Sequence, residues 1–390
     1  MHWHDTRSWP KSLSNALQKP QIAAPPADEA TRLTKLGENL LRGGKHGEAA
    51  TVFERAETLG GFRQFANFAF CYLALGRPDS ALAVCDRGLV GAPGDSSDLH
   101  RLRGDALASL KRKAEAREAY RRAVATTDYA YTAAESLLLP LLSDPDGTHL
   151  LAACEELPAA YANCTVVRGF RAIALSRLGR TEEAKMLVDL DRYVGQFSFE
   201  PPVEFGGIER FNALLATEIL LNPTLHYIEA YGFHRAEHLD VKEARAFPVL
   251  AKFLQTTIEN FIAEFPRRGL DAILPPAPME GYLKTAGNVV RGKESHHSHL
   301  HKFAYVSGVY HVTVPTQDGA EARGGSLVIG ACDDFTGGYA PCWGSRDIRP
   351  KPGVATLLPS HIFHSVVPTN STQPRIAVPF DLGMVIPHQR

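Results

Sequence analysis

The chain has 390 residues, of which 44% are hydrophobic and 22% are charged. These fractions are typical of soluble globular proteins, and the length exceeds what one hydrophobic core usually supports, so we expect two or three domains. The 42 basic and 43 acidic residues give a net charge of −1, which argues against a general nucleic-acid-binding protein.

The sequence predicts neither export nor membrane insertion. No stretch approaches the roughly 18 apolar residues that a membrane-spanning helix needs. The first residues, MHWHDTRSWPKSLSNALQ, lack the apolar core of a secretory signal. Six cysteines without CxxC spacing favour buried thiols over disulfides or a zinc site. We therefore expect a cytoplasmic protein with no membrane partner.

Residues 1–29 contain Pro20, Pro25 and Pro26 and are expected to form a tail or strap. An internal repeat follows. Four segments share one pattern: GKHGEAATVFERA from Gly44, GRPDSALAVCDRG from Gly76, KRKAEAREAYRRA from Lys111 and GRTEEAKMLVDLD from Gly179. Their equivalent alanines, at positions 49, 81, 116 and 184, are separated by 32, 35 and 68 residues. The last spacing is twice 34, so one degenerate unit (THLLAACEELP, near residue 150) completes the series.

Small and large residues also recur at fixed places in the repeat. Twelve positions before each alanine stand Gly37, Ala69, Gly104 and Ala172, and four positions after stand Phe53, Cys85, Tyr120 and Val188. A helix pair of this kind cannot bury its apolar face alone, so such pairs stack into an array. The pattern resembles the tetratricopeptide repeat over residues 30–195, and the resemblance implies a helical solenoid that binds a peptide or a partner domain.

Residues 101–122 carry eight basic and three acidic side chains. A solvated helix face is favoured here over a groove for an acidic ligand, because charge runs on helices usually face water.

The pattern changes after the repeats. QFSFEPPVEF, residues 196–205, ends the helical periodicity, and its proline pair indicates a domain boundary. FPVLAKFLQTTIENFIAEF, from Phe247, predicts a helix. Short β-branched segments bounded by Gly, Pro, Asn and Asp then predict strands at 305–315, 325–331, 353–359, 364–368 and 375–382. We therefore expect a multidomain α + β protein whose residues 205–390 form a sandwich or jelly roll with flanking helices.

The segment ESHHSHLHKF, residues 294–303, holds four of the 16 histidines. Residues i and i+2 of a strand share one face, so His299 and His301 are predicted to converge. His364 begins a later predicted strand, and Arg375 opens the last one. Two close ligands, one distant ligand and then an arginine is the order used by jelly-roll iron oxygenases that consume 2-oxoglutarate.

These residue types suit that chemistry. Iron(II) takes a few imidazole or carboxylate ligands on one face and leaves its other positions for a chelating cosubstrate and O₂. The far carboxylate of the cosubstrate is matched by a buried arginine, whose charge is permanent and whose donors are bidentate. Iron(II), with 2-oxoglutarate and O₂ as cosubstrates, is therefore expected.

The segment NVVRGKESHHSHLHKFAYVSGVYHVTVP resembles bacterial 2OG-Fe(II) oxygenases whose signature runs N-V, H-x-H-P and, six residues on, S-G-V-Y-Y-V. IRPKPGVATLLPSHIFHSVVP and RIAVPFD resemble the distal-histidine stretch and the closing arginine strand of that family. The resemblance covers residues 205–386, and many members carry N-terminal tetratricopeptide repeats. It implies a double-stranded β-helix (a jelly-roll or cupin-like domain), His299 and His364 as iron ligands, and Arg375 as the 2-oxoglutarate anchor. It also implies His301 as the third ligand, where other relatives carry Asp.

Several assignments stay open at this stage. A carboxylate could replace His301 as the third ligand, the candidates being Asp333, Asp334 and Asp381. Tyr310 and Asn288 are further candidates for cosubstrate binding, although Tyr310 also fits a core position. His311 has inward parity and is a candidate contact behind the site. His296 and His297 are expected to be loop residues, and His361 is disfavoured relative to His364.

The leading hypothesis is an iron(II)- and 2-oxoglutarate-dependent dioxygenase, a hydroxylase of a peptide or protein side chain, or of a small molecule, that the repeat domain helps to recruit. One alternative is a non-catalytic repeat adaptor with a degenerate metal-binding jelly roll. Another is a three-histidine cupin-type dioxygenase that does not use 2-oxoglutarate, in which Arg375 would be structural.

Overall fold

The computed structural model describes residues 2–3, 29–60, 62–91, 96–126, 131–143, 145–229, 231–271, 273–274, 277–278, 280–315 and 323–384. Two compact units divide these residues. One comprises the described residues within 12–141 and 152–162, and the other those within 1–11, 142–151 and 163–390. Residues 4–28, most of the predicted tail, lie outside the described residues. The domain ranges predicted from the sequence stay predictions.

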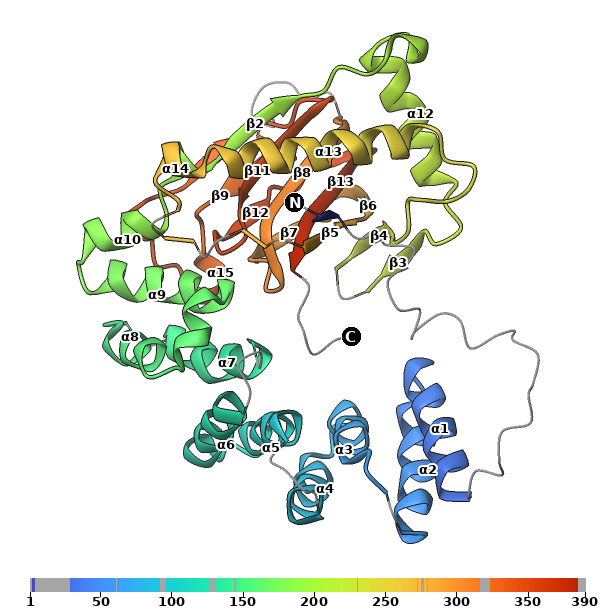
Figure 1. Ribbon diagram of the computed structural model, residues 1–390, viewed down its shortest axis with the longest axis vertical. Coiled ribbons are helices and arrows are strands. Elements are labelled where there is room, and N and C mark those ends of the chain that lie inside the picture. Colours follow the sequence, from blue (N-terminus) through green and yellow to red (C-terminus); the bar gives the residue numbers. More distant parts are fainter. Residues whose placement is uncertain are drawn as a thin grey trace. The chain divides into compact units, whose positions relative to one another are not determined.

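The first unit is built from helix pairs joined by short turns, coloured blue to teal in Figure 1. The segments from Gly44, Gly76 and Lys111 each form the second helix of a pair, which confirms the tetratricopeptide pattern. The degenerate unit near residue 150 corresponds to α7 and α8, which have only eight residues each. The helices are α1 (Glu29–Arg42), α2 (His46–Thr58), α3 (Phe65–Ala74), α4 (Pro78–Gly91), α5 (Ser97–Ser109), α6 (Lys113–Thr126), α7 (Tyr131–Leu138) and α8 (Thr148–Glu155).

Small residues stand where the two helices of a pair approach each other. A Cβ atom added to Gly37 would lie 2.5 Å from the ring of Phe53, and one added to Gly104 would overlap the ring of Tyr120. Both rings are buried at the predicted core positions of the second helices. Glycine therefore lets the large ring of one helix pack directly on the backbone of the other.

The first helices of the pairs end in the same left-handed turn, whose residue is glycine in three of four cases. Gly44, Gly76 and Gly179 have φ angles of 72°, 67° and 70°, and Lys111 takes the equivalent position with φ 62°. Side chains rarely adopt this conformation because their Cβ crowds the backbone. The α5–α6 turn therefore stores backbone strain at Lys111.

Five of the eight basic residues in the run over residues 101–122 form ion pairs with neighbouring carboxylates. Most of these pairs are half-exposed or exposed, so the prediction of a solvated helix face is confirmed. The pairs are Arg101 with Asp98 and Asp105, Arg103 with Asp86, Arg112 with Glu115, Arg121 with Glu156 and Arg122 with Glu118.

The second unit holds two sheets, antiparallel except where β1 joins β5. The larger has the order β2-β11-β8-β13-β6-β4-β3, with β5 also pairing with β13, and the smaller has the order β10-β9-β12-β7. The strands are β1 (His2–Trp3), β2 (Gly195–Ser198), β3 (His226–Ile228), β4 (Phe233–Ala236), β5 (Glu280–Thr285), β6 (Gly287–Gly292), β7 (His296–His299), β8 (Ala304–Thr313), β9 (Leu327–Ile329), β10 (Arg346–Ile348), β11 (Val354–Pro359), β12 (His364–Val366) and β13 (Ser371–Met384). The jelly-roll fold class expected from the sequence is confirmed.

Helices cover one face of the larger sheet. Figure 1 shows α13 lying across β11, β8 and β13, and the side chains of α12 and α13 share one buried cluster with these strands. The helices of this unit are α9 (Thr165–Arg177), α10 (Thr181–Leu187), α11 (Leu190–Tyr193), α12 (Ile208–Leu220), α13 (Ala246–Ala263), α14 (Phe265–Arg268) and α15 (Asp333–Thr336), with 3₁₀ turns in the chain at Leu139–Ser143, Ala159–Asn163 and Val203–Phe205.

Strand β13 divides its residues between the core and a cavity. Ile376, Val378 and Phe380 join the helix-facing cluster, whereas Arg375 and Ala377 line a cavity on the opposite face. This is the alternation of a pleated strand. The larger sheet therefore separates the helical layer from the cavity.

The strands predicted from the sequence correspond to β8, β9, β11, β12 and β13, and the predicted helix from Phe247 corresponds to α13. The segment taken as a boundary contains a strand, because β2 pairs with β11. Among the described residues, five cysteines are buried and all six are free, as expected. No described helix is long and apolar enough to cross a membrane.

Candidate metal centre

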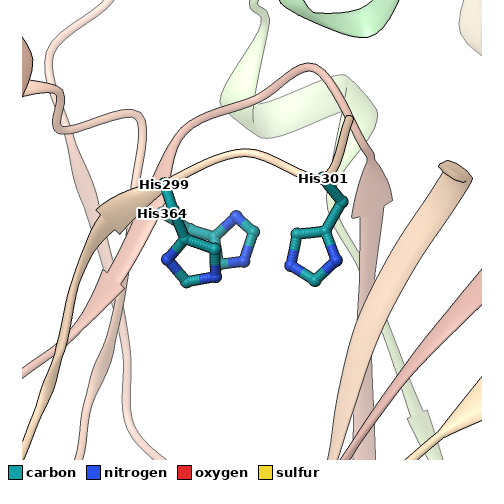
Figure 2. Close-up of side chains that lie close together, drawn as sticks. All are labelled: His299, His301 and His364. Carbon is teal, nitrogen blue, oxygen red and sulfur yellow. The ribbon is translucent and has the colours of Figure 1, made fainter. Parts of the chain in front are cut away.

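Three histidines meet in the second unit. His299 of β7 lies opposite His364 at the start of β12, and their ring centroids are 4.4 Å apart. The ring of His301 faces both of them, at 5.2 Å from His299 and 5.1 Å from His364 (Figure 2). One ring nitrogen of each residue lies within 4.8 Å of those of the other two. This spacing suits three ligands of one metal ion.

The second nitrogen of each ring is already engaged. Nδ1 of His299 lies 2.8 Å from the carbonyl oxygen of His297, and Nδ1 of His364 lies 3.1 Å from that of Ile362. Nδ1 of His301 lies 2.7 Å from a carboxylate oxygen of Asp381. A ring whose Nδ1–H donates to an oxygen keeps its Nε2 lone pair free, which is how protein imidazoles are usually prepared for a metal.

Burial keeps two of these rings neutral. It lowers the pKa of His299 to about 4, with a further contribution from the neighbouring His301. It also holds the pKa of His364 well below its usual value, with His299 and His301 adding to the effect. Neutral imidazoles can bind a cation without first losing a proton.

His301 reaches the cluster by a route that differs from the sequence prediction. Strand β7 ends at His299, so His301 follows in a short irregular segment and does not share a strand face with His299. Its backbone N–H donates to the carbonyl oxygen of Ser360, at 3.1 Å. The chain turn, rather than strand parity, brings His301 to the other two rings.

A β-bulge in β7 determines whether His296 or His297 points into the cavity. In the pairing of β7 with β12, His299 lies opposite His364 but His296 lies opposite Val366, so β7 contains one extra residue. A bulge of this kind shifts the alternation of side chains by one position. His296 therefore lines the cavity and His297 is exposed. The expectation that His296 is a loop bystander is wrong.

The carboxylates considered as a third ligand have other neighbours. Asp334 accepts a hydrogen bond from the backbone N–H of Ser298, and Asp333 beside it is exposed. Asp381 is buried behind His301. Burial opposes its charge, but His301 and other neighbours outweigh that effect and keep the pKa of this carboxyl below its usual value. Asp381 thus supplies a negative charge close to the three rings without belonging to their cluster.

The three rings line a cavity of about 90 Å³ that also contains Arg375. At roughly 15 Å³ for each water, this space suits a small organic acid. Within the described part of the chain its lining contains two arginines and no acidic side chain. The lining residues are Arg235, Asn288, His296, His299, His301, Gly308, Val309, Leu327, Leu358, His364, Val366, Arg375, Ala377 and Pro379.

Arg375 is a buried cation with no carboxylate partner among the described residues. It is 1% exposed, and burial lowers its pKa to about 10. Its Nη2 lies 3.5 Å from Nδ1 of His311, and its Nε has no hydrogen-bond partner among the described residues. A buried charge of this kind is costly unless an anion pairs with it. The cavity beside it is the place from which that anion can come.

Asn288 lines the cavity, as a residue that binds the cosubstrate would have to. Its amide Nδ2 is 3.1 Å from Nε2 of His296, and its carbonyl oxygen accepts from Nη1 of Arg235 at 3.3 Å. Arg235 also bonds Glu237 through Nε, at 2.9 Å. The sequence did not indicate Arg235 or His296 as site residues. The short β4 carries no alternation signal, and the bulge that turns His296 inward cannot be read from the sequence.

The remaining candidates lie elsewhere. Tyr310 has the opposite orientation to Val309 of β8 and donates its hydroxyl to Asn212 of α12 at 2.7 Å, so contact with a cosubstrate does not fit this geometry. His361 is held by the carbonyl oxygen of Leu187, 2.7 Å from its Nε2, and not by the cluster. His311 is buried behind Arg375, as its inward parity suggested.

The packing around Gly308 explains why the S-G-V-Y segment has glycine at this position. A Cβ atom at this position would overlap the ring of Phe380 and the carbonyl oxygen of Thr356. Gly308 therefore allows β8 to pack between its two neighbouring strands while it lines the cavity.

Residues 287–381 match the family described as "Putative 2OG-Fe(II) oxygenase", and residues 102–126 match the tetratricopeptide repeat. No curated protein matches the chain significantly. Similar solved structures include a prolyl-4-hydroxylase of Pseudomonas putida, 15% identical, with a TM-score of 0.35 over 51% of this chain and 96% of the other. A prolyl hydroxylase of Trichoplax adhaerens, in complex with a hypoxia-inducible-factor peptide fragment, is 14% identical, with a TM-score of 0.34 over 53% and 92%.

A tetratricopeptide repeat protein of Parabacteroides merdae is 19% identical, with a TM-score of 0.32 over 42% of this chain and 65% of the other. The chain thus joins a segment that matches the tetratricopeptide repeat to a segment that matches the family described as putative 2OG-Fe(II) oxygenase.

Proposed function

We propose that this chain is an iron(II)- and 2-oxoglutarate-dependent dioxygenase that hydroxylates a side chain of a peptide or protein, or a small molecule. The observation that carries the proposal is the coexistence, in one cavity, of three convergent histidines and a buried arginine that has no carboxylate partner among the described residues. Together they match a metal ion and a dicarboxylic cosubstrate.

The donor set fits iron(II). His299, His301 and His364 would hold the ion through Nε2, because each Nδ1 faces an oxygen acceptor. Three ligands leave positions open for a chelating cosubstrate and O₂. Asp381 behind His301 offsets the positive charge that a set of three neutral ligands would otherwise leave on the centre. When bound, the iron supplies the activation of O₂ that is coupled to oxidation of 2-oxoglutarate to succinate and CO₂.

Arg375 fits the far carboxylate of 2-oxoglutarate. Its charge is buried and meets no carboxylate among the described residues, and a planar guanidinium binds a carboxylate through two parallel hydrogen bonds. His311 lies on the other side of the guanidinium and restricts its orientation. Asn288 lies on the neighbouring strand, opposite Ala377 of β13, and we propose it as a further contact for the ligands of this cavity.

The same observation weighs against a three-histidine dioxygenase in which Arg375 is structural. A structural arginine that is 1% exposed would need acceptors from the protein, and Arg375 has only His311 among the described residues. For the repeats we propose a role in recruiting a peptide or protein substrate, because stacked helical repeats present extended binding surfaces.

Anaerobic binding tests the proposal. The protein is loaded with iron(II) and titrated with 2-oxoglutarate, and the visible charge-transfer absorption of the chelate is recorded. O₂ is then added and succinate is measured. We expect a saturable absorption band and slow formation of succinate without a primary substrate. Arg375→Gln should weaken the binding of 2-oxoglutarate and leave iron binding intact.

Three results contradict the proposal in different ways. Folded protein that binds iron without a band or succinate would support a metal-binding adaptor. Consumption of O₂ without succinate would support a dioxygenase that does not use 2-oxoglutarate. Equal loss of iron and 2-oxoglutarate binding in Arg375→Gln would make Arg375 a structural residue.

A further inference from the structure

His301 differs from the other two histidines in how its backbone is held. His299 and His364 lie opposite each other in paired strands, so the ladder fixes their separation. His301 lies outside any strand, and its position depends on tertiary contacts alone. Its N–H donates to the carbonyl oxygen of Ser360. Its own carbonyl oxygen belongs to the next peptide group and accepts a long hydrogen bond, 3.5 Å, from the N–H of Ala304, so a second and closer partner would hold that group in place.

Helix α9 supplies that partner. The hydroxyl of Thr165, the first residue of the helix, is 3.1 Å from the carbonyl oxygen of His301 and 2.8 Å from that of Lys302. A hydroxyl has one proton, so the two carbonyls share a single donor. Thr165 is 6% exposed, so water cannot readily replace the hydroxyl. This contact spans 136 residues of sequence.

One turn further along, the same helix touches the segment that leads to His364. A Cβ atom at Gly169 would lie 2.9 Å from the carbonyl oxygen of His361 and 2.9 Å from a methyl carbon of Leu300. The next residue, Phe170, stacks on Phe363 with ring centroids 6.2 Å apart. The helix backbone therefore packs directly against both chain segments that carry the candidate ligands.

The burial of α9 agrees with this role. Eleven of its 13 residues are buried, whereas a repeat helix at a free surface exposes one face. Near its C-terminus Ser176 bonds the hydroxyl of Tyr339 at 2.8 Å and accepts from the N–H of Cys342 at 2.8 Å. Although its sequence belongs to the repeat pattern, α9 lies in the same compact unit as the sheets.

We propose that α9 is a positioning element of the metal centre, in which the Thr165 hydroxyl fixes His301 and the bare backbone at Gly169 fixes the approach to His364. The inference rests on the proposed metal site and extends it. A catalytic domain cut from the chain after the repeat pattern would then lack part of the support for its metal. The last repeat is therefore a component of the site as well as of the array.

Cobalt(II) binding to the full-length chain tests this inference without any turnover. Cobalt(II) reports both its affinity and, through its visible absorption, the number and arrangement of its ligands. Thr165→Val removes the hydroxyl at nearly constant shape, Thr165→Ser keeps it, and Gly169→Ala adds one methyl group. Alanine is the better helix former, so Gly169→Ala should not weaken α9 by itself.

We expect Thr165→Val and Gly169→Ala to bind cobalt(II) about tenfold or more weakly, as happens when groups behind metal ligands are removed. The Thr165→Val spectrum should shift toward that of His301→Ala, whereas Thr165→Ser should restore both affinity and spectrum. The matched control is Thr217→Val in α12, whose hydroxyl bonds Ala213 at 2.9 Å on an exposed face. It should behave as the unaltered protein.

The possible failures are distinguishable. If the unaltered chain does not bind cobalt(II), the metal site itself is wrong and the proposed function falls with it. If the unaltered chain binds and both α9 variants keep its affinity and spectrum, only the positioning role is refuted. Failure of Thr165→Ser to restore binding, or an equal loss in Thr217→Val, would also refute it, because the hydroxyl contact would not be the cause.

Discussion

Replacement of Arg375 by methionine should change two properties in opposite directions. The side chain is 1% exposed and has no carboxylate partner among the described residues, and burial lowers its pKa to about 10. Methionine has a similar length, carries no charge and adapts to irregular space. Arg375→Met therefore removes the cation with little change in packing.

The size of each effect follows from the environment. The burial that lowers the pKa of Arg375 disfavours the charged form by roughly 3 kcal/mol. Without ligand, the free energy of unfolding should therefore stay constant or rise by up to about 3 kcal/mol, as in other replacements of buried charges. Two charge-assisted hydrogen bonds to 2-oxoglutarate, at about 1.5 kcal/mol or more each, are lost, so its Kd should rise about 100-fold or more.

Urea denaturation of the metal-free protein measures the first effect, and calorimetric titration of the zinc(II)-loaded protein with 2-oxoglutarate measures the second. Zinc(II) affinity should change by no more than about twofold, because Arg375 is not one of the three residues of the cluster. A loss of stability of several kcal/mol, or an unchanged affinity for 2-oxoglutarate, would refute the view that this charge is kept for a ligand.

Three further predictions concern other sites. Asp381→Asn removes the charge behind His301 and should weaken zinc(II) binding about tenfold in a competition titration, and unaltered affinity would mean that this contact does not tune the ligand. Burial lowers the pKa of His361 to about 4, against 6.5 in the unfolded chain. The unfolded chain therefore takes up a proton first, and the stability that the neutral buried ring contributes is fully present above pH 6.5 and is lost as the pH falls toward 4. Unfolding free energies at pH 7 and 5 should differ by about 2 kcal/mol from this residue, and His361→Gln should remove that part of the difference. Lys111→Gly should relieve the strain of the left-handed turn and raise the free energy of unfolding by about 1 kcal/mol, measured by urea denaturation. Arg117→Gly, on the exposed face of α6, is the control and should lower the free energy of unfolding by a similar amount.

Local patterns in the sequence determined most of the architecture. The spacing of Gly37 and Phe53 defines a helix pair because the ring packs on a glycine twelve positions before the repeat alanine. The alternation from Arg375 to Leu382 defines a strand with one core face and one cavity face. These signals are readable because each depends on residues that are close in the sequence, within one helix pair or one strand.

The composition of the centre was partly readable as well. The short spacing of His299 and His301, the later His364 and the arginine of the last strand indicated a site, and all four lie around one cavity. The prediction that His299 and His301 converge because they share one face of a strand was wrong, since His301 lies beyond the end of β7. The assignment of these residues to metal and cosubstrate remains a prediction for the experiments above.

Only the tertiary structure decided which other residues reach the site. A bulge in β7, set by its pairing with β12, turns His296 inward. The antiparallel pairing of β4 with β6 places Arg235 opposite Asn288. Asp381 contacts the ring of His301 and Thr165 its backbone carbonyl, across 80 and 136 residues of sequence. No local pattern encodes such contacts, because they arise from the docking of whole elements. The sequence by itself thus determined the elements and the residue types of the centre, and the packing of α9, β7 and β13 decided how each ligand is held.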